Sequence, residues 1–402
     1  IDIPEINTIL FLRPTESTTV FLQQLGRGLR LSEGKECLTV LDFIGQAHKK
    51  YSYENKLRAL IGKTHNIIKT EIENEFPNMP KGCFLQLERT AKKYILDNIK
   101  NAVINKRNII QKIKSFNIDT GKEINLVNFV NHYDMTFNDI YKTKASFSRL
   151  CVEAGVREDF YNENEEDITK GMQRLQNIDS RRLIEFYLHT MNSMDEFYNK
   201  ELNEEEKKMI LMLHYTFWQK PPKDLNFKGV RESVLNLYEN RELFQEIKEV
   251  LEYNKEKINF IDKSIDLGFT CPLHLHCKYS RDQILSAVGY HSEEKKSSHR
   301  EGVLYLKDEK LDIFFITLNK SEKDYSPSTM YEDYAINEEL FHWQSQSTTS
   351  ENSATGQRYI NHKKTGSKVI IFVREYKKEE GFTANYYYLG TASYVRHEGD
   401  RP

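Results

Sequence analysis

The chain has 402 residues, which is more than one compact core usually holds, so two or three domains are expected. Its 58 basic and 60 acidic side chains leave a net charge of −2, which excludes a uniformly basic nucleic-acid coat protein. A hydrophobic content of 39% excludes a wholly disordered chain. No apolar run approaches the roughly 18 residues of a membrane span, and no secretory signal is present, so no membrane partner is expected.

Five scattered cysteines, an odd number, predict reduced thiols and a cytoplasmic location. Cys271 and Cys277 lie close together with two histidines between them. However, structural zinc usually takes its ligands from two separated pairs, so no metal site is expected. The chain begins at Ile1 rather than Met, and we interpret it as a fragment of a longer protein.

The pattern of apolar residues predicts three successive regions. Residues 1–48 show a strand–helix–strand rhythm, with the strands at 8–12 and 36–43 and the helix at 18–30. From about residue 51 to 257 the apolar residues have a helical period. From residue 269 onward the period is two, and the expected strands cover 302–306, 311–318, 368–374 and 385–395. The expected domains are therefore 1–48, 49–260 and 261–402.

The most specific motif lies in the first region and reads Q-x-x-G-R-x-x-R. Its fixed positions are Gln23, Gly26, Arg27 and Arg30. Gln23, Arg27 and Arg30 recur at i, i+4 and i+7, so they are expected on one helical face. Guanidinium groups on such a face can reach the γ-phosphate of ATP bound to a neighbouring domain and stabilise the charge of phosphoryl transfer. The alternative is an amphipathic helix whose arginines form surface ion pairs.

This motif resembles the last signature motif of superfamily-two helicases. The resemblance implies that residues 1–48 are the remnant of a second RecA-like lobe. The 402 residues contain no G-x-x-x-x-G-K-[ST] phosphate loop and no Asp-Glu-x-His magnesium motif. We therefore expect no cofactor and no ATPase activity in this stretch alone, whereas ATP and magnesium are the cofactors expected of the parent helicase.

Further strings extend the resemblance over the rest of the chain. They are residues 76–83, 146–155, 341–346, 388–390 and 397–399. They resemble the C-terminal part of bacterial proteins that fuse a phospholipase-D-type nuclease, a superfamily-two helicase and a domain of unknown function, as in SauUSI-like modification-dependent (type IV) restriction endonucleases of phage defence. The resemblance implies a mainly β, SRA/PUA-like last domain that flips a modified cytosine out of duplex DNA. It also places nuclease activity upstream of Ile1.

A base-flipping pocket needs planar side chains that stack on the base and polar groups that read its edge. The richest cluster of such residues lies between Tyr325 and Gln346 and also includes Phe341 and His342. The residues expected to contact the base are Tyr331, Asp333, Tyr334, Trp343, Ser345 and Gln346. An Asp can accept a hydrogen bond from the cytosine amino group. Core packing would equally explain Trp343, and residues 345–356 have the composition of an ordinary polar loop.

A basic line is expected in the helical region. Between Lys92 and Lys114 the chain has seven basic residues and one acid. Lys93, Lys100, Arg107 and Lys114 repeat every seven residues, so in one continuous helix they form a line that drifts about 20° per heptad. Such a line could follow a phosphate backbone, and the alternative is a solvated face.

The expected fold is thus multidomain α + β, with an α/β lobe remnant, an all-helical middle domain and a mainly β C-terminal domain. The expected function is DNA binding in an ATP-dependent helicase-nuclease, with double-stranded DNA, with modified cytosine, as the partner. The main alternative is a protein-docking scaffold that positions motor and nuclease without reading bases. A helicase accessory region directed at RNA is a third alternative. The DNA sequence, the type of modification and a homodimeric state are left open.

Overall fold

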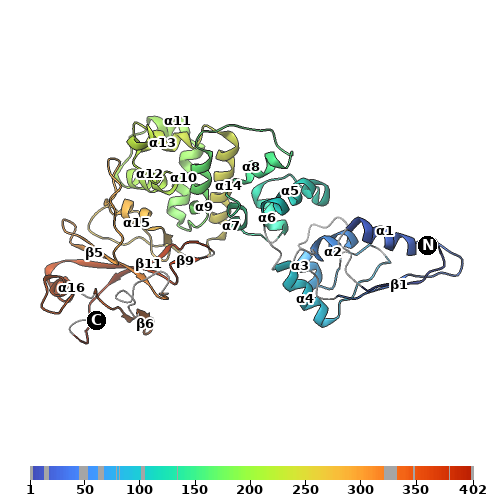
Figure 1. The fold of residues 1–402 in the computed structure, drawn as a ribbon. Helices are drawn as coiled ribbons and strands as arrows, with labels where there is room; N and C mark the ends of the chain where they lie inside the picture. Colours follow the sequence, from blue (N-terminus) through green and yellow to red (C-terminus); the bar gives the residue numbers. More distant parts are fainter. Residues whose placement is uncertain are drawn as a thin grey trace. The chain divides into compact units, whose positions relative to one another are not determined.

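The computed structural model describes residues 3–12, 18–44, 53–61, 68–77, 79–80, 82–100, 105–133, 135–320, 333–346, 349–379 and 381–399. Both helices and strands contribute to the fold (Figure 1). The chain divides into two compact units. The N-terminal unit comprises Ile1–Thr143 and Arg149–Glu158, and the C-terminal unit comprises Lys144–Ser148 and Asp159–Pro402. Each is described by itself.

The N-terminal unit begins with a strand–helix–strand element. Strand β1 (Thr8–Phe11) is parallel to β2 (Thr39–Asp42), and α1 (Thr18–Gly28) connects them, as the sequence pattern predicts. The end of α1 lies close against the sheet, because a Cβ added to Gly28 would be 2.5 Å from Ile9 Cδ1. The glycine therefore permits a close approach between helix and strand.

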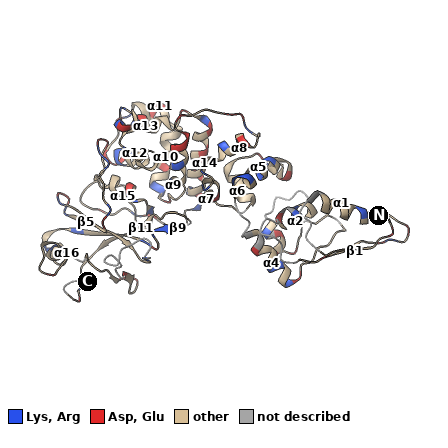
Figure 2. Ribbon diagram, viewed as in Figure 1, with Lys and Arg blue, Asp and Glu red and all other residues tan. Residues whose placement is uncertain are grey.

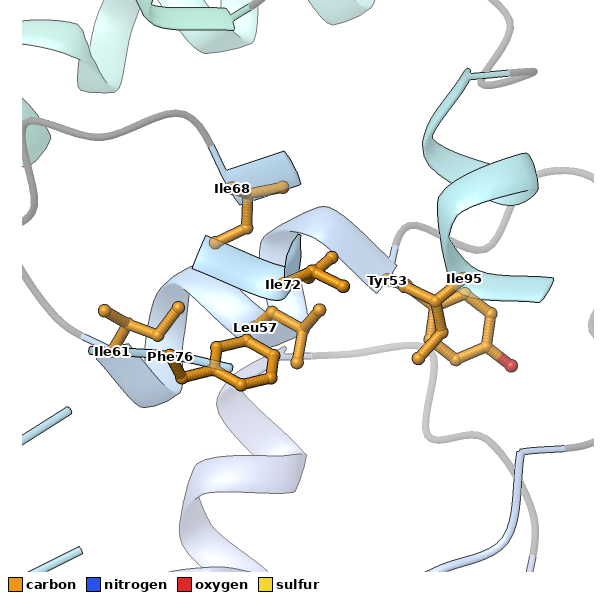
Figure 3. Packing of buried hydrophobic residues seen from close by; sticks show 7 residues of the cluster. All are labelled: Tyr53, Leu57, Ile61, Ile68, Ile72, Phe76 and Ile95. Carbon is orange, nitrogen blue, oxygen red and sulfur yellow. The ribbon is translucent and has the colours of Figure 1, made fainter. Parts of the chain in front are cut away.

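Helices make up the rest of this unit. They are α2 (Tyr53–Ile61), α3 (Ile68–Glu73), α4 (Arg89–Lys100), α5 (Lys106–Thr120), α6 (Leu126–Tyr133) and α7 (Phe137–Tyr141), followed by α8 (Phe147–Glu153), which crosses into the C-terminal unit. Figure 3 shows the core formed by α2, α3 and α4. In α2, Tyr53, Leu57 and Ile61 recur every four residues and are all buried in this core.

The expectation of one continuous helix across Lys92–Lys114 is wrong. Helix α4 ends at Lys100, and α5 begins at Lys106. Asn105 has an extended backbone, with φ of −133° and ψ of 159°, and its side chain accepts a hydrogen bond from the backbone N–H of Asn108. Asparagine is a strong N-cap, and here it starts a new helix inside the basic stretch.

The C-terminal unit opens with a helical part. Its elements are α9 (Glu165–Leu175), α10 (Arg181–Asn192), α11 (Met194–Asn199), α12 (Glu204–Phe217), the 3₁₀ turn η1 (Pro222–Leu225), α13 (Val230–Asn236) and α14 (Arg241–Lys257). Figure 2 shows acidic and basic residues interspersed over these helices. Helix α12 is buried along residues 209–217. A helix that is buried around its whole circumference forms the centre of a packed bundle.

A five-stranded mixed sheet follows the helical part. Its strands lie in the order β3 (Lys278–Tyr279), β11 (Tyr386–Ala392), β8 (Lys368–Arg374), β5 (Leu311–Thr317) and β4 (Val303–Leu306). The pair β5–β8 is parallel and the other pairs are antiparallel. Two small hairpins pair β6 (Tyr334–Ala335) with β7 (Phe341–His342), and β9 (Lys378–Glu379) with β10 (Phe382–Thr383).

The C-terminal region is less purely β than its sequence pattern predicts. Helices α15 (Arg281–Ala287) and α16 (Ala354–Thr365) accompany the sheet. Helix α15 packs on α12, and Gln283 Nε2 donates to Thr216 Oγ1 at 3.1 Å. The helical part and the sheet thus share one compact unit, which groups the chain differently from 1–48, 49–260 and 261–402. Whether those three ranges act as functional domains stays a prediction.

A helix that crosses a membrane needs about 20 mostly apolar residues. Among the described helices, none combines the length and the apolar composition needed to cross a membrane.

Candidate functional site

The arginine motif lies on the surface of the strand–helix–strand element. Gln23 and Arg27 are exposed and lie one turn apart on α1. Arg30 is also exposed, but α1 ends at Gly28, so Arg30 lies in the segment that follows the helix. The expectation that all three side chains share one helical face is therefore wrong for Arg30, because the helix ends where Gly28 approaches β1.

The segment that carries Arg30 is tied down by one lysine. Lys35 Nζ donates to the carbonyl oxygens of Pro4, Gly28 and Arg30, at 2.9, 2.5 and 3.0 Å. A cation at the C-terminal end of a helix satisfies carbonyl groups that the helix leaves unpaired and interacts favourably with its dipole. Lys35 thus holds the backbone that positions Arg30.

The motif glycine occupies open space. A Cβ added to Gly26 would meet no atom within 4 Å. Glycine inside a helix costs about 1 kcal/mol relative to alanine, and no close contact among the described residues explains that cost at Gly26. Within the part of the chain that the structure describes, the surface at Gly26 is therefore clear for the close approach of another group.

The aromatic cluster of the C-terminal unit combines packing with partial exposure. Trp343 is half-buried, and its ring lies 4.1 Å from that of Phe314, with an angle of 32° between the planes. It also meets the Tyr359 ring edge-on at 5.5 Å. Phe314 and Tyr359 belong to the core between the sheet and α16. Core packing therefore accounts for part of the Trp343 surface.

Asp333 already has partners for both of its carboxylate oxygens. Lys320 Nζ lies 2.6 Å from Oδ2, and the backbone N–H of Gln344 donates to Oδ1 at 2.9 Å. The side chain of Asp333 is only 3% exposed. A buried, paired carboxylate is expensive to separate from its partner. Asp333 in this arrangement fixes the β6–β7 hairpin next to the end of β5.

The remaining predicted base contacts are divided between two places. Gln346 lies beside Tyr359, whose hydroxyl donates to Gln346 Oε1 at 3.2 Å, and burial raises the pKa of Tyr359 to about 12. Ser345 is half-buried in the same segment. Tyr334 instead lies on the β6–β7 hairpin, with its ring 4.8 Å from that of His342. Tyr331 lies outside the described residues.

One charged pair in this unit was not expected. Asp312 is fully buried in β5, and its two oxygens receive hydrogen bonds from Arg358 Nε and Nη2, both at 2.9 Å. Burial raises the pKa of Asp312, although Arg358 opposes that rise. The Arg358 guanidinium also lies 3.9 Å from the centre of the Tyr305 ring. An Asp inside the apolar run LDIFFIT needs a hydrogen-bonding or ionic partner, so the sequence alone indicates that such a partner exists.

The basic residues of the N-terminal unit are distributed over two helices. Lys93 is exposed on α4, and Arg107 and Lys114 are exposed on α5. Lys100 is the last residue of α4, and its side chain is outside the described set. Two neighbours on α5 are already paired, Lys106 with Glu153 at 2.6 Å and Lys112 with Glu54 at 3.0 Å. The exposed cations remain candidates for phosphate contacts.

The next question is whether the described residues include a set of metal ligands. The described residues contain no group of three or more His, Cys, Asp or Glu side chains that could hold a metal ion. Cys271 and Cys277 are free thiols, and burial raises the pKa of Cys271 to about 11 and of Cys277 to about 12. His274 instead pairs with Asp262, Nδ1 to Oδ2, at 3.0 Å.

Comparisons with known proteins give one family match and one partial relative. Residues 273–401 match a family described as "Domain of unknown function (DUF3427)". A stretch of 44 residues is 48% identical to part of the Saccharomyces cerevisiae protein named "Putative ATP-dependent helicase IRC3". That stretch is 11% of this chain and 6% of the yeast protein. The chain therefore contains a domain of unknown function and has a partial likeness to a helicase.

Proposed function

We propose that this chain is the C-terminal region of an ATP-dependent helicase or translocase acting on double-stranded DNA. Gln23, Arg27 and Arg30 contact the phosphates of ATP held by a lobe that supplies the phosphate loop and magnesium. The C-terminal unit binds DNA and reads a modified cytosine, as the type IV restriction class implies. ATP hydrolysis then drives DNA movement, and cleavage belongs to a separate nuclease domain.

The observation that carries the ATP role is the exposed motif on α1. Arg27 and Arg30 are placed on rigid backbone, by α1 and by the three carbonyl contacts of Lys35 respectively. Gly26 leaves room beside Arg27. Preorganised guanidiniums stabilise the charge that develops on a transferring phosphoryl group. The partial likeness to a helicase supports the same assignment.

The test of this role is ATP hydrolysis by residues 1–402 joined to the lobe that carries the phosphate loop. Because arginines of this kind contribute about 10³-fold or more to kcat, Arg27→Ala should lower kcat by about that factor with little change in KM. Arg241→Ala, which changes an exposed arginine in the first turn of α14, is the matched control. An unchanged kcat in Arg27→Ala would rule out the phosphate contact.

The DNA role rests on the surface around Trp343. Trp343, Tyr359 and Gln346 form one cluster, in which Gln346 Oε1 accepts from Tyr359. Gln346 Nε2 has no partner among the described residues, so it can donate to an acceptor on a base. Exposed parts of aromatic rings provide stacking surface for an extruded base. Tyr334 adds a second, separate aromatic surface on the hairpin.

This part is tested by titrating the 402-residue chain with a duplex that carries one methylated cytosine and with the same unmodified duplex. The methylated duplex should bind about tenfold tighter, since a good base contact contributes roughly 1–3 kcal/mol. Fluorescence of 2-aminopurine beside the methylated base should rise on binding. Gln346→Leu should abolish the preference, whereas Gln357→Leu on the exposed side of α16 should not. Equal affinities for both duplexes would reject modification reading.

A scaffold role has one specific observation in its favour. The β6–β7 hairpin exposes Tyr334, Ile336 and Leu340, and its tip carries Glu338 and Glu339. Apolar surface beside acidic side chains suits a protein partner better than a phosphate backbone. If the chain has no affinity for either duplex and forms a tight dimer in analytical ultracentrifugation, the scaffold role replaces DNA reading.

A further inference from the structure

We propose that α2 is the mechanical link between the arginine-bearing strand–helix–strand element and helices α5 and α6. In this role Lys56 and Arg58 are positioning residues, which act on Arg27 and Arg30 through the backbone that carries them. The proposal rests on the proposed function and deepens it, because it names the route by which force on α5 reaches the ATP-contacting arginines.

Lys56 joins α2 to all three parts of the strand–helix–strand element. Its Nζ lies 2.5 Å from Oδ2 of Asp42, at the end of β2. The same ammonium lies 4.5 Å from the ring centre of Phe21 on α1 and 5.7 Å from that of Phe11 on β1. Lys56 is 6% exposed. An ammonium that is shielded from water is attracted to the faces of aromatic rings, and its partner carboxylate adds to this attraction.

Glu54 and Arg58 join α2 to α5 and α6. Glu54 Oε2 receives a hydrogen bond from Lys112 Nζ of α5 at 3.0 Å. Burial alone would raise the pKa of Glu54, but Lys112 and Arg58 outweigh it and lower that pKa. Arg58 Nη1 lies 3.0 Å from Nε2 of His132 on α6. These contacts tie the middle of α5 and the last turn of α6 to one side of α2.

His132 contributes to this second cluster as a neutral acceptor. Burial, and then the charge of Arg58, lower its pKa to about 4. Its Nε2 therefore accepts from Arg58 at neutral pH, while its buried Nδ1 has no partner in the described structure. The cations of Arg58 and Lys112 also lie over the Tyr133 ring, at 5.1 and 4.5 Å from its centre. Arg58 and Lys112 are therefore held by directional contacts with His132 and Tyr133 as well as by the charge of Glu54.

The contacts of Lys56 lie on one side of α2, and those of Glu54 and Arg58 lie on another. A third side of α2 packs against α3 and α4. Glu54 and Arg58 are one turn apart, whereas Lys56 is about 200° around the helix from Glu54. The third side carries Tyr53, Leu57 and Ile61, which pack into the core with α3 and α4 (Figure 3). The Lys56–Asp42 and Glu54–Lys112 ion pairs are largely shielded from water, so α2 moves more readily as a body than relative to either neighbour.

The connection has a direct consequence for the proposed DNA-dependent ATPase. Helix α5 carries Arg107 and Lys114, which are candidates for phosphate contacts. The other end of the link contacts Asp42, Phe11 and Phe21, on the element that presents Arg27. A displacement of α5 therefore reaches the arginine motif through one helix.

The test is amide hydrogen exchange in the 402-residue chain, which requires neither ATP nor DNA. Lys112→Met removes the contact between Glu54 and α5 while keeping the length of the side chain, and it leaves the pairing of Glu54 with Arg58 in place. It should speed exchange at least about threefold in residues 25–30, at the end of α1. Lys106→Met, on the same helix but paired with Glu153, is the matched control and should leave that segment unchanged.

Two further variants separate a link from general loosening. In a Lys56→Met background, adding Lys112→Met should cause no further change in the amide exchange of residues 25–30. In a Lys56→Arg background, which keeps the charge, adding Lys112→Met should again speed that exchange. If Lys112→Met affects only α5, α6 and α2, or if the effect persists in Lys56→Met, the link is wrong. Because neither ATP hydrolysis nor DNA binding is measured, failure here is distinguishable from failure of the proposed function.

Discussion

Two pairs of parallel strands in this chain, β1–β2 and β5–β8, are each joined by a connection that contains a helix, but they are buried to different degrees. In the C-terminal unit, all seven residues of β5 are buried. Tyr359 of α16 covers one face through Phe314, and Arg281 of α15 lies 4.1 Å from the Phe315 ring on the other face. In the N-terminal unit, Leu10 and Leu41 of β1 and β2 are 54% and 49% exposed.

The difference in exposure follows from how many faces of each pair of strands are covered by other elements. Parallel sheets are stable when both faces are covered, and a pair of strands is at best marginal alone. Within the described residues, β1 and β2 gain their cover from α1 and the Lys56 contacts on one side only. The arginine motif is therefore carried by the less enclosed of the two elements.

The largest expected contrast comes from truncating one side chain in each sheet. Phe314→Ala should lower the free energy of unfolding of the C-terminal unit by about 3–5 kcal/mol, because it leaves a cavity beneath Trp343 and Tyr359. Leu41→Ala should cost less than about 0.5 kcal/mol in the N-terminal unit. Urea unfolding followed by tryptophan fluorescence reports the first, since Trp218 and Trp343 both lie in the C-terminal unit. Exchange of the β2 amides reports the second. Similar costs would show that β1–β2 is as enclosed as β5–β8.

One buried group in each unit should change the stability of that unit with pH, and the two changes should run in opposite directions. Burial raises the pKa of Asp179 to about 6 in the C-terminal unit, so its native state keeps a proton that the unfolded chain releases, and stability falls as pH rises from about 4 to 6. His132, with its pKa lowered to about 4, makes the N-terminal unit lose stability as pH falls from about 6.5 to 4. From the size of the two pKa shifts, each contribution is at most about 3.5 kcal/mol.

Substitutions isolate these contributions from those of other groups. The buried His214 also has a pKa of about 4 and adds an acid-sensitive contribution to the C-terminal unit. The comparison is therefore variant against wild type, from pH 4 to pH 7. Asp179→Asn should become relatively more stable as pH rises, and His132→Gln relatively more stable as pH falls. Parallel curves for variant and wild type would contradict the assigned pKa directions.

The smallest expected effect concerns the two glycines of α1. Gly26→Ala should stabilise the N-terminal unit by about 0.5–1 kcal/mol, because alanine favours the helix and the space is open. Gly28→Ala should destabilise it by roughly 1 kcal/mol, since its Cβ would press on Ile9 and Leu38. The stabilities of the two variants are compared by heating each one and measuring the amide hydrogen exchange of α1 at each temperature. If Gly26→Ala also lowers ATP hydrolysis in the complete enzyme, the open space is used by the nucleotide or its lobe.

Elements with strong local periodicity were predictable from the sequence. The strands at Thr8–Phe11 and Lys368–Arg374 lie where alternation and β-branched residues predict them. Helices α15 and α16 were missed, although both have recognisable starts. Ser280 and Gln283 form a capping box, and Ser353 caps α16 inside a stretch whose composition favours a loop. The break at Asn105 was missed for a related reason, because a heptad count ignores capping.

The sequence by itself determined the residue content of the Q-x-x-G-R-x-x-R motif, the missing phosphate loop and the order of helical and strand regions, since these depend on neighbours along the chain. Tertiary structure alone decided that Asp333 is engaged by Lys320, that Arg358 neutralises Asp312, and that Lys56 contacts Asp42. It also decided that Arg30 lies beyond α1. Such pairings depend on how distant segments pack, because a buried charge must find its partner in space rather than in sequence.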